Sequence, residues 1–130
     1  MLHVLLVCRF AVPESGVDAF VARARRALEL LSAQPGCRGV RLARATEESE
    51  RWMLVAEFDS VVAYRRALSP FEVREHVIPL LSEALADEPA AYEVLGTAEG
   101  GELRERPSLL ARDAGSVRVG EAAAPSTEPR

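Results

Sequence analysis

The chain has 130 residues and a formal net charge of −4, and all 16 of its basic residues are Arg. That length holds one domain, and an acidic balance without a basic stripe argues against nucleic acid as a partner. No stretch approaches the ~20 apolar residues that span a bilayer, and no basic segment precedes the short apolar start, so we expect a cytoplasmic protein without membrane segments. Cys8 and Cys37 form no CxxC pair, which predicts reduced thiols and no structural zinc.

The first half of the chain alternates between strand and helix patterns. Residues 2–10 predict a strand with apolar residues on both faces, as in a central strand that is covered on both sides. Ser15, with Asp18 three residues on, predicts a helix start, and a 3.6-residue apolar period continues to about Ala33, where Pro35-Gly36 stops it. Residues 37–45 predict an edge strand whose Arg side chains discourage pairing with other chains. Residues 52–58 predict another strand.

The second half repeats the pattern with a longer helical part. Ser60 predicts the cap of a helix over 61–68. Ser69, Pro70 and Glu72 form a capping-box pattern that predicts a second helix to about Leu85, kinked at Pro79. Residues 90–95 predict the last strand.

The predicted order β-α-β-β-α-β is the ferredoxin-like α+β fold with a four-stranded antiparallel sheet. Right-handed crossovers put both helical parts on one face, so the other face is bare and apolar. That face carries either Leu2, Val4, Leu6 and Phe10 or Leu5 and Val7 on the first strand, and either Trp52, Leu54 and Phe58 or Met53 and Val55 on the third. A soluble monomer rarely exposes such a patch, so we expect a homodimer that pairs through its sheets. The domain covers 1–95, and the Gly-, Ala-, Pro- and Ser-rich segment 96–130 is predicted to be mostly disordered.

No phosphate loop, G-x-S-x-G, H-E-x-x-H or dinucleotide motif is present, so the sequence predicts no cofactor or metal. His76 is predicted to share a helix face with Val73, Val77, Leu80 and Ala84. An imidazole there serves either as an acid, base or ligand, or as a core or rim histidine bonded to a neighbour.

Four other side chains have both a functional and a structural interpretation. Trp52 lines a flat aromatic slot or belongs to the core. Arg66 and Arg74 pair with an anion in a closed site or are solvated. Cys8 points into the same space or is an inert buried thiol.

The run EFDSVVAYRRALSPFEVREHVIPLL, together with LLVCRF, a helix and a Pro-Gly stop, resembles the antibiotic biosynthesis monooxygenase family over residues 2–95. The resemblance implies a dimeric α/β barrel. It also implies a monooxygenase that oxidises an aromatic polyketide, anthrone or quinol-type small molecule with O₂ and without a cofactor. A deprotonated, electron-rich substrate then reduces O₂ itself, in a dry slot with a proton acceptor and a charge stabiliser.

The resemblance also implies roles for single residues. His76 is then the base or hydrogen-bond partner, Arg74 steadies the anion, and Trp52 completes the catalytic set. The substrate pocket is formed by Cys8, Phe58, Tyr64 and Phe71. Two alternatives stay open. One is a haem-binding or haem-degrading member, which the spacing of Ser69 and His76 matches but Cys8 and Arg66 do not. The other is a non-catalytic, ligand-binding dimer.

Overall fold

The computed structural model describes residues 3–108. The chain divides into two units, Met1–Val94 and Leu95–Arg130, which are described separately. Within residues 3–108, no helix is long and apolar enough to cross a bilayer.

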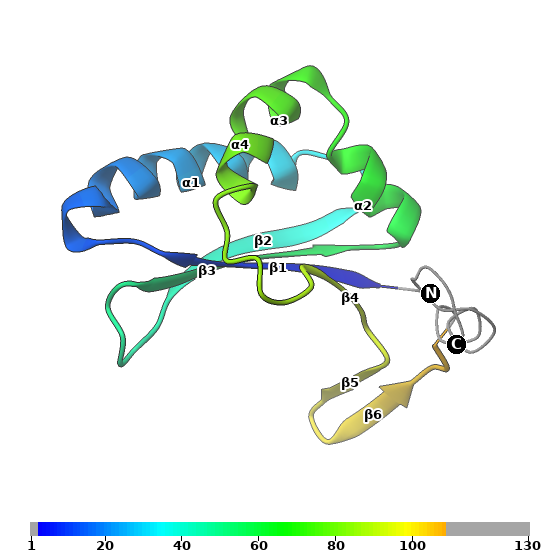
Figure 1. The fold of residues 1–130 in the computed structure, drawn as a ribbon. Coiled ribbons are helices and arrows are strands. Elements are labelled where there is room, and N and C mark those ends of the chain that lie inside the picture. Colours follow the sequence, from blue (N-terminus) through cyan, green and yellow to red (C-terminus); the bar gives the residue numbers. More distant parts are fainter. Residues whose placement is uncertain (1–2, 109–130) are drawn as a thin grey trace, which may run out of the picture. The chain divides into compact units, whose positions relative to one another are not determined.

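The first unit is a four-stranded antiparallel sheet with all of its helices on one face (Figure 1). The central strand β1 (Val4–Ala11) pairs with β3 (Arg51–Phe58) and with β4 (Ala91–Glu93), and β2 (Cys37–Arg44) pairs with β3. The helical layer consists of η1 (Glu14–Gly16), α1 (Val17–Ser32), α2 (Val61–Ala67), α3 (Phe71–His76) and α4 (Ile78–Leu81). The predicted α+β class and the four-stranded antiparallel sheet are confirmed.

The core lies between this sheet face and the helices. Alternate residues of β1 are buried, as the two-residue period of a strand requires, and β3 adds the fully buried Leu54, Ala56 and Phe58. The buried residues of α1 recur every three or four positions and form the stripe that closes on the sheet: Phe20, Ala24, Ala27 and Leu31.

The same alternation identifies the bare face of the sheet. Because Val4, Leu6, Cys8 and Phe10 are buried, the opposite face of β1 carries Leu5, Val7 and Arg9. The register places Val7 opposite Val55 and Arg9 opposite Met53. Of the two alternatives that the sequence left open, the bare face is therefore the one with Leu5, Val7, Met53 and Val55; Leu2 lies outside the described residues.

Only one of the three predicted helix caps is present. The Ser60 Oγ accepts a hydrogen bond from the Ala63 N–H at 3.0 Å, as predicted. The predictions for Ser15 and Ser69 were wrong. A 3₁₀ turn precedes α1 and leaves Gly16 at its cap, and the Ser69 hydroxyl donates instead to the Arg66 carbonyl at 2.8 Å.

The helix that was predicted from Ser69 to Leu85 is two short helices that meet at Val77. Pro79 has no N–H for the carbonyl of Glu75, and its ring clashes with that carbonyl. The break still leaves Val73, Val77 and Leu80 fully buried, so both pieces pack on the core.

A glycine sets the turn between α1 and β2. Gly36 has φ +83°, and a Cβ atom there would lie 2.6 Å from the Ala63 Cβ. The Gly36 carbonyl accepts from the Asp59 N–H at 2.8 Å, so the turn is tied to the start of α2. A left-handed conformation costs a residue with a side chain roughly 1–2 kcal/mol even without a clash.

Gly36→Ala is therefore expected to lower the free energy of unfolding by about 2–3 kcal/mol, since strain and overpacking add. Urea denaturation measures it. The matched experiment repeats the change in an Ala63→Gly background, where the same substitution is expected to cost clearly less. An equal cost in both backgrounds would contradict the close approach to Ala63.

The described part of the second unit is a β-hairpin. β5 (Gly96–Glu99) pairs antiparallel with β6 (Glu102–Glu105) through the glycine turn Gly100-Gly101. Residues 96–105 thus depart from the disorder expected for 96–130, and residues 109–130 of that prediction lie outside the described residues.

Candidate functional site

The helix α2 holds Tyr64 over the buried face of β1. The Ser60 cap begins the helix, and the Tyr64 N–H donates to the Ser60 carbonyl at 3.0 Å. The Tyr64 ring packs on the ring of Phe58, with centroids 5.7 Å apart. These contacts fix the phenol against a core residue.

Tyr64 lines a pocket of about 450 Å³ where the edge of β1 meets α2, α4 and the segment 84–90. Most of its lining is apolar, which suits a small hydrophobic ligand, and its volume lies within the usual range for ligand pockets. The apolar lining residues include Leu6, Leu68, Ile78, Leu81 and Ala84, and the polar or ionisable ones are Cys8, Arg9, Tyr64, Ser82 and Glu88.

The segment 84–90, which follows α4, forms one wall of this pocket because part of it turns away from the edge of β1. The Leu85 N–H donates to the Arg9 carbonyl and the Val7 N–H donates to the Ala90 carbonyl, both at 2.7 Å. Between these bonds the chain runs Ala86-Asp87-Glu88-Pro89, and the proline cannot donate to a strand ladder. Residues 86–89 therefore turn away from β1 instead of extending β4.

The phenol and the thiol in the pocket are both protonated at neutral pH. Burial raises the pKa of Tyr64, the neighbouring Cys8 raises it further, and Arg65 opposes the shift. Burial also raises the pKa of the Cys8 thiol. Within residues 3–108 the Tyr64 hydroxyl makes no hydrogen bond, whereas that of Ser82 already donates to the Pro79 carbonyl at 2.7 Å. Tyr64 therefore offers the pocket an uncommitted neutral donor.

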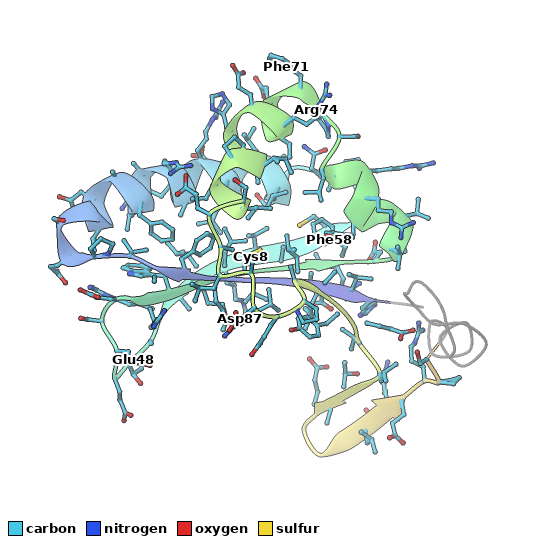
Figure 2. All side chains as sticks on the ribbon, viewed as in Figure 1. Cys8, Glu48, Phe58, Phe71, Arg74 and Asp87 are labelled. Carbon is cyan, nitrogen blue, oxygen red and sulfur yellow. The ribbon has the colours of Figure 1, made fainter. Side chains whose placement is uncertain are left out.

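Two carboxylates share one guanidinium at the mouth of the pocket. The Arg9 Nη2 lies 2.9 Å from the Glu88 Oε1 and 3.2 Å from the Asp87 Oδ1. Glu88 lines the pocket with Tyr64, whereas Asp87 lines a different hollow and lies on the side of the sheet away from the helices (Figure 2). Adjacent residues with the same partner thus face different spaces.

Trp52 lies away from Tyr64, in an aromatic cluster at the start of β3. Its ring packs edge-on against Phe20, with centroids 5.5 Å apart, and the Arg44 guanidinium carbon lies 4.8 Å from its centroid. Trp52 lines the hollow of about 620 Å³ that Asp87 also lines. Its Nε1 is buried and has no hydrogen-bond partner among the residues that the structure describes.

The predicted face of His76 was wrong. Its side chain is 44% exposed and lies in a hollow of about 310 Å³ together with Ala22, Arg23, Arg26, Glu75 and Pro79. The Nε2 atom is 3.6 Å from the Glu75 Oε1. Val73, Val77 and Leu80 form the buried stripe, and His76 flanks it.

Phe71 and Arg74 also lie outside the pocket. Phe71 is 68% exposed, and Figure 2 shows both residues at the outer end of α3, away from the sheet. Of the predicted site residues, the structure thus brings together Cys8, Phe58 and Tyr64, and it separates them from Trp52, Phe71, Arg74 and His76. The catalytic roles assigned to His76, Arg74 and Trp52 stay predictions.

Arg9 and Glu88 were missed as site residues. Arg9 interrupts an otherwise apolar strand, which is a signal for a functional or interface residue. Glu88 stands in an Asp-Glu-Pro run beyond the helix that the sequence predicts to about Leu85. Arg9 and Glu88 are 79 positions apart in the sequence, and only the fold brings them into contact.

A family model described as "Antibiotic biosynthesis monooxygenase" matches residues 3–77 of the chain. These residues include Cys8, Phe58 and Tyr64, and they end before the wall that contains Glu88. The comparison with curated proteins gave no significant match.

Solved structures show the same fold. SnoaB, a cofactor-independent oxygenase from Streptomyces nogalater, is 22% identical; the match covers 78% of this chain and 100% of that one, with a TM-score of 0.62. A conserved protein from Methanosarcina mazei Go1 is 21% identical, with 72% and 92% coverage and a TM-score of 0.60. Rv0793 from Mycobacterium tuberculosis is 17% identical, with 75% and 98% coverage and a TM-score of 0.59.

Proposed function

The chain belongs to the antibiotic biosynthesis monooxygenase family, and from that premise we propose that it is a cofactor-independent monooxygenase of a small aromatic substrate. We place the reaction in the pocket between β1, α2 and α4. The observation that carries the proposal is the uncommitted Tyr64 hydroxyl in an apolar pocket of about 450 Å³. Our proposed substrate class is an anthrone or quinol-type aromatic polyketide, and we expect the protein to act in the cytoplasm.

For an anthrone the reaction balances without any other oxidant. The CH₂ group loses a proton, and the resulting anion transfers one electron to O₂. The two radicals combine through a new C–O bond, and protonation gives a hydroperoxide. The second C–H bond and the O–O bond then break with loss of water, which leaves a ketone. One oxygen atom of O₂ enters the product and the other leaves in water.

The pocket residues supply what this sequence of steps needs. The Tyr64 hydroxyl donates a hydrogen bond to the substrate oxygen on which the negative charge collects, and such a donor is strongest in an apolar surrounding. Glu88 is the carboxylate among the lining residues, and we assign it the role of proton acceptor. Cys8 and the apolar side chains shape the slot and exclude water, and Phe58 supports the Tyr64 ring from behind.

The resemblance to SnoaB supports this proposal by analogy of fold, because that protein is described as a cofactor-independent oxygenase. The analogy gives a reaction class to test and leaves the substrate to experiment.

The residues do not fit the haem alternative. His76, the histidine that the haem alternative would use as iron ligand, does not line this pocket. Burial raises the pKa of the two side chains there that could replace it, Cys8 and Tyr64, so both stay protonated. We therefore derive no step through haem.

We also propose that the protein is a homodimer that pairs through the bare face of its sheet. Leu5, Val7, Met53 and Val55 are only half-buried in the single chain, and Tyr92, opposite Leu5, is 39% exposed. Pairing two such faces removes their apolar surface from water and completes an α/β barrel.

The test is oxygen consumption by EDTA-treated protein across a panel of anthrones and quinols, repeated with ¹⁸O₂. We expect one O₂ consumed per ketone formed, one labelled oxygen atom in the product, and no hydrogen peroxide. A complete lack of uptake across the panel would favour the non-catalytic, ligand-binding dimer. Stoichiometric peroxide would show that O₂ acts only as an electron acceptor.

A further inference from the structure

The outer face of α2 is basic and apolar at once. Val62 is 55% exposed, and Arg65 and Arg66 lie three and four residues further on, so all three share one exposed face. On α3, the next helix along the chain, Phe71 and Arg74 are also exposed. Within residues 3–108, Arg65, Arg66 and Arg74 form no ion pair. We call Val62, Arg65, Arg66, Phe71 and Arg74 the α2–α3 patch; Glu72 and Glu75 lie beside it, and Glu75 pairs with His76.

The β5–β6 hairpin has the opposite charge and also exposes apolar side chains. Its strands carry three Glu and one Arg, and every residue from Leu95 to Glu105 is exposed. Leu103 is 63% exposed and lies opposite Ala98, so one face of the hairpin is apolar at its centre. A two-stranded hairpin without a packed face is marginally stable in water. This hairpin therefore needs a surface to cover it.

We propose that the β5–β6 hairpin is an arm that packs on the α2–α3 patch of a second copy of this chain. The acidic arm matches the basic patch, and Leu103 matches the exposed Val62 and Phe71. Because each copy has one arm and one patch, reciprocal exchange closes at two copies without leaving an open end. This interface is additional to the pairing of the sheet faces, and it gives a function to the exposed Phe71 and Arg74, which the pocket does not use.

The test exchanges the charges in the full-length chain. One variant carries Arg65→Glu and Arg66→Glu, which makes its patch acidic like its arm. The other carries Glu102→Arg and Glu105→Arg, which makes its arm basic like its patch. Each variant alone opposes like charges, so its dimer dissociation constant at 0.15 M salt is expected to rise at least about tenfold.

Mixing the two variants restores both contacts, because each arm then meets a patch of opposite sign. Native mass spectrometry of the equilibrated mixture should show heterodimers well above the share expected for random pairing. A third variant, Arg25→Glu with Arg26→Glu on α1, matches the change in net charge, and its mixture with the basic-arm variant should pair at random. Random pairing in both mixtures would overturn the proposal. Random pairing is also the result expected if each arm docks on its own chain.

Discussion

Replacing Val55 with Asp should turn the protein into a monomer. Val55 stands at the middle of the bare sheet face, opposite Val7 on β1 and Arg41 on β2. Pairing of two such faces takes both copies of residue 55 out of water, and the desolvation of a buried carboxylate costs several kcal/mol, which the neighbouring Arg41 offsets only in part. A penalty of about 4 kcal/mol raises the dissociation constant of the dimer roughly 1,000-fold.

Sedimentation equilibrium across a dilution series measures this change, and circular dichroism checks that the monomer remains folded. Val55→Thr is the matched control, because it keeps the branched shape without a charge, and its dimer should weaken far less. A Val55→Asp protein that dimerises as tightly as the wild type would place the interface elsewhere on the molecule.

Replacing Glu88 with Gln is expected to lower kcat about 100-fold with little change in KM. A positioned general base contributes roughly 10²- to 10⁴-fold, and the amide keeps the size of the side chain while losing its basicity. Steady-state oxygen uptake with an anthrone gives both constants. The effect should appear in kcat because the role that we propose for Glu88 is to accept the C–H proton and not to bind the substrate.

Asp87→Asn is the control that the structure provides for this experiment. Asp87 and Glu88 are neighbours that pair with the same Arg9 Nη2, but only Glu88 lines the pocket. Asp87→Asn should therefore leave kcat within about threefold of the wild type, because Asp87 does not line the pocket and an exposed ion pair contributes only about 0.2–1 kcal/mol to stability. Equal losses in the two variants would indicate that the Arg9 ion pairs matter for the loop and that neither carboxylate is the base.

The fold could be read from the sequence because local signals and side-chain alternation agreed. Strand β1 has apolar residues at every position from Val4 to Cys8, which predicts cover on both faces. The alternation left two choices for the bare face, and only the packing of Phe20 and Leu31 of α1 decided between them. The alternation along a strand shows which residues share a face, but it does not show which face the helices cover.

The candidate site was harder to predict, for two physical reasons. His76 follows Val73 by three residues within the same helix α3, a spacing that places it at the flank of the buried stripe, so the apolar period alone did not decide whether it is buried. The wall of the pocket is a loop held to β1 by two backbone hydrogen bonds, and such bonds leave no side-chain pattern in the sequence. Tyr64 and Phe58, which the sequence singled out and which pack together, both lie on regular elements, whereas Glu88 lies in this loop.

Oxygen uptake with an anthrone tests the proposed site most directly when it is measured for three EDTA-treated proteins: the wild type, Ala84→Trp and His76→Ala. Ala84 lines the pocket, and an indole there fills the space that we assign to the substrate. We expect Ala84→Trp to lose nearly all uptake, and we expect His76→Ala, whose side chain lies in a separate hollow, to keep most of it. Retained uptake in Ala84→Trp together with its loss in His76→Ala would show that the reaction takes place in the hollow around His76 and not in the pocket around Tyr64.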